Sequence, residues 1–432
     1  VIFDGVFNHT GRDFFAFKDI QHNRESSQYR DWYCNVNFQG NNEYNDGFSY
    51  DNWGGYNLLV KLNQQNPAVR KYLLDVVKYW VSEFDVDGIR LDAADVLDFG
   101  FMHELRMLAN EIKPEFWLMG EVIHGDYSRW VNSDMLHSVT NYQLYKALYS
   151  GHNEHNYFEI AHTVRYLLDK GNLPYHLYNF VDNHDVERIY TRLLNKHEFV
   201  PVHILMYTLP GIPSIYYGSE FGIEGRKEKH SDAVLRPAIN LEDYPNALDE
   251  NGCTNIIARL GEIRQKNSVF SDGIYQELRL TNRQYAFSRT NEITQAIVVV
   301  NNDEVDSSLD IPATGTYTEL LSGEIQSVDG NLHVHLRACS GQIWMKDYDE
   351  TVTRKRKVKI PEIKQVAVKE ETIKQVTVDY SKSYEEMSIE ELQACVLEKL
   401  AKNGPVTEQM KRDVANNVFH DSLINWVKSF RN

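Results

Sequence analysis

Cysteine is scarce in this 432-residue chain, which has only Cys34, Cys253, Cys339 and Cys395. No two of them are close in sequence, whereas zinc knuckles and dithiol redox motifs need closely spaced pairs. Disulfide frameworks belong to shorter chains in which cysteine is far more frequent. The sequence therefore argues against all three features, and its few scattered thiols favour a reducing compartment such as the cytoplasm.

Positive charge is also in short supply. The chain has 45 Lys and Arg residues against 62 Asp and Glu residues, which gives a formal net charge of −17. A protein that binds nucleic acid needs positive charge to neutralise phosphates. We therefore expect no nucleic-acid partner.

A long uninterrupted apolar run is missing as well. The most apolar stretch, residues 199–218, is broken by Pro201, Pro210 and Pro213, which favours a buried helix and strand over a membrane span. We expect no membrane association. The chain has neither an initial methionine nor a signal-peptide pattern, and it begins directly in the apolar run Val1 to Phe3. This start predicts an N-terminal truncation, and any signal peptide would lie in the missing part.

The first two-thirds of the chain alternate short apolar runs with longer amphipathic periods. The clearest helix begins with Asn66 as its cap and Pro67 at its first position, and it extends to Phe84. Such alternation predicts a parallel sheet with both faces covered, either a closed barrel or a doubly wound sheet. The predicted strands span residues 1–6, 86–91, 116–120, 138–142, 176–181 and 213–217, and further helices lie around 101–112, 157–170 and 200–208.

Polar side chains at the strand ends favour the barrel. Barrel enzymes build their sites from the carboxyl ends of several strands. A doubly wound sheet usually carries a glycine-rich first turn, which this sequence lacks. The residues at or just after these strand ends are Asp4 with His9, Arg90 with Asp92, Glu121, and His184 with Asp185.

The composition divides the chain into four regions. Residues 1–271 form the predicted catalytic barrel, with an inserted subdomain at about 10–63 that is rich in Asn, Gly, Asp and Tyr. Short strand patterns separated by turns predict an antiparallel β-sandwich domain over 272–346. A charged linker follows over 347–380, and a helical tail over 381–432 begins with a capping box of Ser388 and Glu391.

Carboxyl groups at these strand ends suit the cleavage of glycosidic bonds by double displacement, which needs one carboxylate nucleophile and one proton donor. Arg90 and Asp92 are two residues apart on a strand, so they share a face and the guanidinium favours an ionised Asp92. The same spacing fits a buried structural ion pair equally well. Glu121 follows an apolar run that would raise its pKa, although a lone glutamate is more often an ordinary surface residue. Asp185 supplies a third carboxylate beside His184.

Four short blocks in these regions resemble, in order and spacing, the signature regions of the α-amylase family of glycoside hydrolases. The resemblance covers roughly residues 1–345 and includes Tyr216-Tyr217-Gly218 at the last predicted strand. The blocks are Asp4-Gly5-Val6-Phe7-Asn8-His9, Gly88-Ile89-Arg90-Leu91-Asp92, Gly120-Glu121-Val122 and Phe180-Val181-Asp182-Asn183-His184-Asp185.

This resemblance implies a role for each candidate residue. Asp92 would be the nucleophile, Glu121 the general acid and base, and Asp185 the stabiliser of the transition state, in a retaining enzyme that cleaves α-glucosidic bonds. His9, Arg90 and His184 would bind the sugar next to the scissile bond, and Asp4 would support the site. In this family the third barrel strand carries the first signature block. Because that block begins here at residue 4, we expect a (β/α)8 barrel that lacks its first two strands.

The resemblance also bears on substrate and metal. Val60-Lys61-Leu62-Asn63 is similar to an extra signature of the neopullulanase, cyclomaltodextrinase and maltogenic-amylase group, which implies maltodextrins, cyclodextrins or related α-glucans as substrates. Asp95 and Val96 stand where classical α-amylases carry a Lys-His pair, so the preference between α-1,4 and α-1,6 bonds stays open. The chemistry needs no cofactor, and Asn8 matches a calcium-binding position of classical α-amylases.

Three alternatives remain at this point. A metal-dependent barrel hydrolase could use His9, Asp92, His184 and Asp185 as ligands, but the paired histidines typical of such sites are absent. A catalytically impaired carbohydrate-binding or scaffold protein could share the fold, since fold alone does not determine function. Transglycosylation to a sugar would use the same residues and the same intermediate as hydrolysis.

Overall fold

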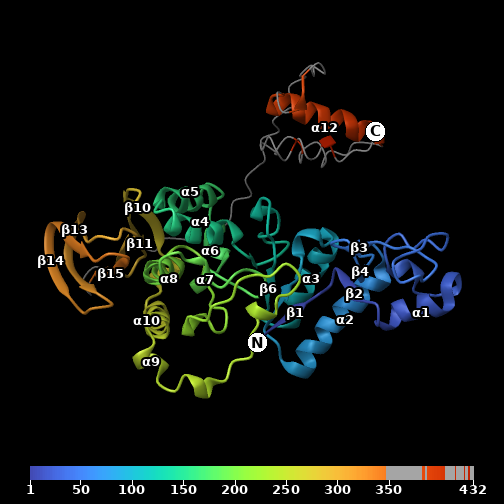
Figure 1. The fold of residues 1–432 in the computed structure, drawn as a ribbon, viewed down its shortest axis with the longest axis horizontal. Coiled ribbons are helices and arrows are strands. Elements are labelled where there is room, and N and C mark those ends of the chain that lie inside the picture. Colours follow the sequence, from blue (N-terminus) through green and yellow to red (C-terminus); the bar gives the residue numbers. More distant parts are fainter. Residues whose placement is uncertain (347–381, 385–386, 404–413, 415–422, 424–426, 429–432) are drawn as a thin grey trace. The chain divides into compact units, whose positions relative to one another are not determined.

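A computed structural model describes residues 1–346, 382–384, 387–403, 414, 423, 427 and 428. The chain divides into two compact units, Val1–Ile363 and Lys364–Asn432 (Figure 1). None of the helices among the described residues has both the length and the apolar character needed to span a bilayer.

The centre of the first unit is an arc of parallel strands. Strands β1 (Ile2–Gly5), β5 (Gly88–Leu91), β6 (Trp117–Gly120) and β7 (Ser138–Val139) form a four-stranded parallel sheet in that order. β8 (Tyr178–Asn179) and β9 (Ile212–Pro213) pair in parallel. A parallel bridge between Thr140 and Tyr178 joins the two sheets. The strands thus follow one another in chain order, as in a β/α barrel and unlike a doubly wound sheet.

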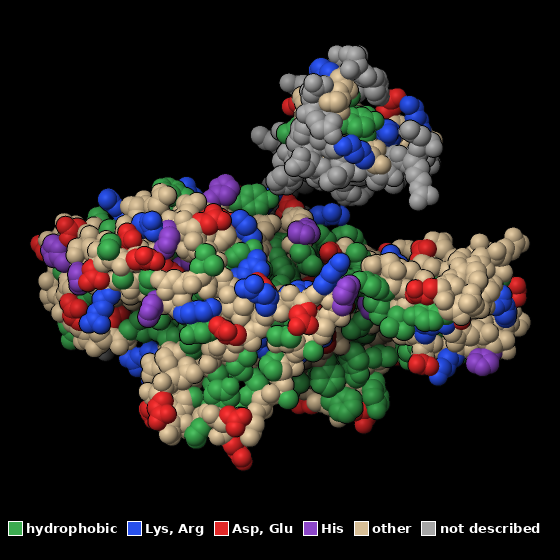
Figure 2. Space-filling model, viewed as in Figure 1, with side chains coloured by type: hydrophobic (Ala, Val, Ile, Leu, Met, Phe, Trp, Pro, Cys, Tyr) green, Lys and Arg blue, Asp and Glu red, His purple; other side chains and the backbone are tan. Residues whose placement is uncertain are grey.

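All six predicted strands are confirmed, although the last lies a few residues earlier than expected. In residues 1–346 the pairing of β1 is with β5 alone and that of β9 with β8 alone, so the arc is open at both ends. Apolar side chains gather near the N-terminus and along α2 (Pro67–Phe84) on the face shown in Figure 2. In these two segments the apolar residues Val1, Ile2, Tyr79 and Phe84 are exposed.

Helices follow most of the strands and cover the arc. In α2 the Asn66 side chain accepts a hydrogen bond from the Ala68 backbone N–H, and Pro67 starts the helix, as predicted. The helices predicted near 101–112, 157–170 and 200–208 are α3 (Phe99–Ile112), α5 (Tyr157–Leu168) and α8 (Phe199–Thr208). Two long helices of this region were not predicted, α4 (Tyr142–Asn153) and α10 (Gly252–Lys266). The region also contains four short helices: α6 (Leu173–His176), α7 (Ile189–Arg192), α9 (Ala247–Glu250) and α11 (Val269–Asp272).

The segment expected to form an inserted subdomain leaves the arc after β1. It contains α1 (Phe15–Asn23) and a three-stranded sheet of β2 (His9–Gly11), β4 (Tyr56–Lys61) and β3 (Asn52–Trp53). Its small core includes Phe17, Phe48 and Tyr50, whose rings pack against one another. The pairing of His9 with Lys61 closes the insertion at its base, so the subdomain rises directly beside the end of β1.

The last part of the first unit is an antiparallel sheet of six strands in the order β10-β11-β12-β15-β13-β14. One face packs on α8 through Phe287, Val298 and Val300, and the other face is covered by the folded-over hairpin of β13 and β14. A single folded sheet therefore forms the two layers expected of a sandwich. One of its strands, β10, was not predicted from the sequence. The strands are β10 (Ile274–Leu280), β11 (Gln284–Thr290), β12 (Gln295–Asn301), β13 (Ser307–Glu319), β14 (Ile325–Leu336) and β15 (Ser340–Lys346).

The second unit contains α12 (Ile389–Asn403). Its predicted capping box is confirmed, because the Glu391 N–H donates to Ser388 Oγ and the Ser388 N–H donates to Glu391 Oε2. Leu392, Cys395 and Val396 of this helix are fully buried. The linker predicted over 347–380 lies outside the described residues, as does most of the tail beyond α12.

Candidate active site

The predicted residues of the first three blocks meet at one edge of the arc. Asp4 lies in β1 directly opposite Arg90 in β5. The ladder of hydrogen bonds continues past the ends of the strands, with the Asp92 N–H donating to the Gly5 carbonyl (3.1 Å) and the Glu121 N–H to the Leu91 carbonyl (2.8 Å). This continued pairing places Asp92 and Glu121 side by side after β5 and β6.

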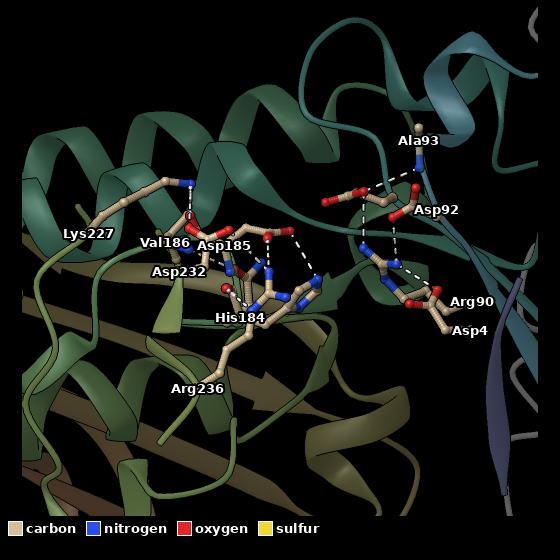
Figure 3. Close-up of polar contacts among 12 residues, drawn as sticks. Asp4, Arg90, Asp92, Ala93, His184, Asp185, Val186, Lys227, Asp232 and Arg236 are labelled. Carbon is tan, nitrogen blue, oxygen red and sulfur yellow. Dashed lines mark hydrogen bonds and ion pairs between the residues drawn. The ribbon is translucent and has the colours of Figure 1, made fainter. Parts of the chain in front are cut away.

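Arg90 binds three carboxylates at this edge. Its Nη1 lies 2.7 Å from Asp4 Oδ1 and 3.1 Å from Asp92 Oδ1, and its Nη2 lies 3.0 Å from Glu121 Oε2 (Figure 3). Burial acts to lower the pKa of Arg90, but Glu121, Asp4 and Asp92 outweigh it and raise the pKa above its usual range. The guanidinium is therefore a permanent cation between the carboxyl groups of Asp92 and Glu121.

Glu121 is the most buried of these carboxyl groups, with 11% of its side chain exposed. Burial raises its pKa, and Asp92 and Asp185 add to that effect, while Arg90 and a hydrogen bond from the Ala93 N–H oppose it. Ala93 has a φ of 46°, in the left-handed region, and this sharp turn after Asp92 aims its N–H at Glu121 Oε2 (3.3 Å). A carboxyl group with a raised pKa is suited to hold a proton near neutral pH.

The fourth block forms a second group on the other side of the view in Figure 3. His184 Nε2 lies 3.0 Å from Asp185 Oδ2, and Arg236 Nη2 lies 2.9 Å from Asp185 Oδ1. Burial acts to raise the pKa of Asp185, but His184 and the charges of Arg236 and Arg90 lower it overall. Lys227 Nζ donates to the Asp185 carbonyl (2.6 Å), so two basic side chains from the segment after β9 hold this residue.

His9 lies at the base of the inserted subdomain, with its ring stacked on Trp53 at a centroid distance of 5.7 Å. Burial lowers the pKa of His9, and the nearby charge of Asp92 only partly opposes this, so the imidazole is neutral at pH 7. A neutral imidazole can donate one hydrogen bond and accept another, which suits contact with sugar hydroxyls.

Asn8, the predicted calcium-binding position, is buried beside His9. Calcium takes six to eight oxygen ligands. The Asn8 amide nitrogen faces His9 Nδ1 at 3.3 Å, and the Asn8 carbonyl accepts the Leu62 N–H. Among the described residues no group of three or more His, Cys, Asp or Glu side chains is placed to hold a metal ion. Calcium binding stays a prediction.

The structure thus brings Asp4, Arg90, Asp92 and Glu121 into one contact network and pairs His184 with Asp185, while the roles predicted for these residues stay predictions. Sequence reasoning missed several groups at the same edge: the Ala93 N–H, Trp53, Tyr142, Asn183, Lys227 and Arg236. The segment that carries Lys227 and Arg236 has no regular periodicity. The signal in the sequence that could have pointed to these two residues is that they are basic and follow the Tyr216-Tyr217-Gly218 block.

Comparison with known families agrees with this arrangement. Residues 1–261 match the family model described as alpha amylase, catalytic domain, and residues 279–399 match the alpha amylase C-terminal all-beta domain. The chain belongs to the α-amylase family. The second match extends beyond β15 into α12, whereas the described antiparallel strands of this α-amylase family member end at Lys346.

Several individual proteins are similar to this family member. A cyclomaltodextrinase of Thermoanaerobacter pseudethanolicus is 32% identical over 311 residues, which cover 70% of this chain and 52% of that enzyme. Neopullulanase 2 of Thermoactinomyces vulgaris is 30% identical, with 79% of this chain and 59% of that enzyme covered. A solved cyclomaltodextrinase structure has a TM-score of 0.71 at 25% identity, covering 80% of this chain and 60% of that chain. The chain therefore spans little more than half the length of the curated relatives it matches.

Proposed function

We propose that this protein is a retaining glycoside hydrolase that cleaves α-glucosidic bonds in maltodextrins, cyclodextrins or related α-glucans. The observation that carries the proposal is the Arg90 guanidinium, which contacts both Asp92 and Glu121 at adjacent strand ends. Retaining enzymes hold their two carboxyl groups about 5–5.5 Å apart, whereas inverting enzymes leave room for a water between them at about 6.5–9.5 Å. Two carboxyl groups that share one guanidinium favour the shorter separation.

In the first step Asp92 attacks the anomeric carbon and forms a covalent glycosyl ester, while Glu121 gives its proton to the departing glycosidic oxygen. In the second step the ionised Glu121 takes a proton from water as the water oxygen bonds to the same carbon and Asp92 leaves. Two inversions give net retention. The raised pKa of Glu121 supports its assignment as the proton donor.

The remaining residues bind and stabilise the sugar in this proposal. The charge of Asp185, held by His184 and Arg236, stabilises the positive charge that develops on the ring in the transition state. His9 and His184 contact the sugar at the scissile bond, and Asp4 fixes Arg90. The names of the relatives, cyclomaltodextrinase and neopullulanase, support cyclodextrins and related α-glucans such as pullulan as the substrate class.

The test is a product profile on maltodextrin, cyclodextrin and pullulan, with the anomeric form of the first product followed by proton NMR. We expect cleavage of at least one substrate and an α-configured first product. Cleavage with a β-configured product would contradict the retaining mechanism. Absence of cleavage of all three would favour the carbohydrate-binding alternative.

Asp92→Asn provides the residue-level test. We expect turnover to fall by about 10⁴-fold or more, because an amide cannot form the glycosyl ester, while oligosaccharide affinity measured by calorimetry changes little. Asp169→Asn, at an exposed aspartate that ends α5, is the matched control and should retain full activity. Undiminished activity of Asp92→Asn would remove Asp92 from the mechanism.

We also propose a cytoplasmic location. The four cysteines, Cys34, Cys253, Cys339 and Cys395, are free thiols, which suits a reducing compartment. One of the relatives is named intracellular maltogenic amylase, from Bacillus subtilis.

A further inference from the structure

The two oxygens of the Glu121 carboxyl group have different surroundings. Oε2 accepts from Arg90 Nη2 at 3.0 Å and from the Ala93 N–H at 3.3 Å. Oε1 lies 3.3 Å from the hydroxyl oxygen of Tyr142. Because Oε2 already accepts two N–H groups, the proton of neutral Glu121 belongs on Oε1, next to Tyr142.

Tyr142 is held firmly in that place. It is the first residue of α4, directly after the capping Asn141, whose side chain accepts from the Leu144 N–H. The Tyr142 ring meets the Phe180 ring edge-on at a centroid distance of 4.9 Å. The hydroxyl therefore reaches Glu121 from a fixed helix start rather than from a loop.

Asn183 determines which way the Tyr142 hydroxyl points. Asn183 Oδ1 accepts the backbone N–H groups of Asp185 (2.8 Å) and Val186 (3.1 Å), so the amide nitrogen is the atom that faces Tyr142, at 3.2 Å. An amide NH2 group can only donate, so the Tyr142 oxygen accepts from Asn183 and its own proton is free to point at Glu121 Oε1. The chain of contacts joins Glu121 to the turn that carries Asp185.

We propose that Tyr142 is a positioning residue whose hydroxyl, oriented by Asn183, holds Glu121 Oε1 ready to release and recover the proton of the two-step reaction. This inference rests on the proposed function for its use in catalysis. In the first step the proton leaves Oε1 for the glycosidic oxygen as the carbon–oxygen bond breaks, and the ionised Oε1 then accepts the Tyr142 O–H. In the second step Oε1 takes a proton from the attacking water.

The hydroxyl stabilises the charged form of Glu121 and so limits the rise that burial causes in its pKa. Tyr142→Phe removes that donor and should raise the pKa of Glu121 by about 0.5 to 1 pH unit. Tyr145→Phe is the matched control, because it removes a hydroxyl from a ring that stacks on the same Phe180 at 5.0 Å. We expect the pKa of Glu121 to change by less than about 0.2 unit in that control.

The experiment measures the pKa of Glu121 directly, by carbon NMR of protein labelled at the glutamate carboxyl carbon, with the Glu121 signal assigned through Glu121→Gln. A rise in Tyr142→Phe without a rise in Tyr145→Phe supports the proposal. Equal values in Tyr142→Phe and the unaltered protein, or equal shifts in both variants, overturn it. This readout needs no turnover, so failure of the proposed function is seen separately, in the product profile.

The kinetic consequence provides a second readout. The basic limb of the pH profile of kcat/KM follows the acid form of Glu121, so it should move to higher pH in Tyr142→Phe by the same amount as the NMR pKa. An aryl α-maltoside with a nitrophenol leaving group needs little protonation and should lose less rate than maltodextrin. Equal losses on the two substrates, with an unmoved basic limb, would indicate that Tyr142 only supports the local fold.

Discussion

Arg90 carries one positive charge for three carboxylates, Asp4, Asp92 and Glu121, with 14% of its side chain exposed. A charge buried to this extent is tolerated only when it is paired and fully hydrogen-bonded. The same contacts that satisfy Arg90 also set the distance between the two carboxyl groups of the proposed reaction. The spacing of Arg90 and Asp92 left a structural ion pair and a catalytic arrangement as alternatives, and in the proposed mechanism one network serves both purposes.

Arg90→Lys should therefore lower the catalytic rate, although it preserves the positive charge. Lysine presents a single ammonium group on a shorter reach, and it cannot hold Asp92 and Glu121 through two separate nitrogens. We expect kcat to fall by about 10²-fold, comparable to the loss of one preorganised donor in an active site. Arg259→Lys, at a half-exposed pair with Glu262 on α10, should leave kcat within about twofold. Steady-state kinetics of both variants gives the comparison. A near-normal kcat in Arg90→Lys would show that activity does not need two separate nitrogens to hold Asp92 and Glu121.

The pH dependence of activity is expected to follow the ionisation of one residue, Glu121. In the proposed mechanism Glu121 must be protonated for the first step, and burial raises its pKa. Activity should therefore persist above the usual pKa of a glutamate and be lost as the pH rises through the raised value. The sequence suggested this only as a tendency of carboxyl groups beside apolar residues. Asp92, Asp185 and Arg90 also shift the pKa of Glu121, and these effects depend on which strands are neighbours.

Among the elements, those that the sequence predicted best have one buried face and clear ends. In α2 the capping Asn66, Pro67 and the buried positions Val69, Leu73 and Val77 agree with each other. α4 was missed because it buries residues around much of its circumference, including Ser150, Gly151 and His152, which hides the helical period. α10 begins at Gly252 and contains Gly261, a residue with low helix propensity.

The candidate site was predicted where its residues follow strands, as Asp92 and Glu121 do. It was missed where a residue reaches the site from another element. Tyr142 begins a helix, and its position next to Glu121 follows from the pairing of β7 with β6. Arg236 reaches Asp185 from an irregular segment 51 residues further along the chain. No local pattern encodes either contact.

The cap of α2 gives an element-scale prediction. Asn66 Oδ1 accepts the Ala68 N–H at 2.9 Å, and its Nδ2 donates to the Asp31 carbonyl at 3.0 Å, so the residue ties α2 to the inserted subdomain. Asn66→Ala should lower the free energy of unfolding by about 1–2 kcal/mol, measured by urea denaturation. Lys71→Ala removes an exposed ion pair with Asp75 on the same helix and should cost no more than about 0.5 kcal/mol. Equal effects of the two variants would contradict the capping argument.

At the scale of the first unit, the helices that follow β7 and the antiparallel sheet share one core. Val298 and Val300 of β12 and Ile343 of β15 belong to the same buried cluster as Val202 and Leu205 of α8. A buried polar contact crosses this junction. Glu198, which precedes α8 and is 1% exposed, lies beside Cys339 of the antiparallel domain. His152 Nε2 lies 4.0 Å from Glu198 Oε2.

Burial raises the pKa of Glu198 to about 7, against effects of Cys339 and Arg283 that lower it, while Glu304 adds to the rise. His152 gives no compensating charge, because burial lowers its pKa to about 4. In the unfolded chain Glu198 ionises near pH 4.5. Below that pH Glu198 is therefore neutral in both states, and its burial does not lower the free energy of unfolding. As the pH rises from there to about 7, the free energy of unfolding falls, and above about 7 the loss is constant.

Glu198→Gln removes this titration while keeping the shape of the side chain. We expect the unaltered protein and the variant to have similar free energies of unfolding at pH 4.5, and the variant to be more stable by about 2–3 kcal/mol at pH 8. Glu111→Gln, at an exposed position of α3, should show no such pH-dependent difference. The measurement is urea denaturation of the three proteins at both pH values. A difference between Glu198→Gln and the unaltered protein that is the same at pH 4.5 and pH 8 would show that burial at this junction does not raise the pKa of Glu198.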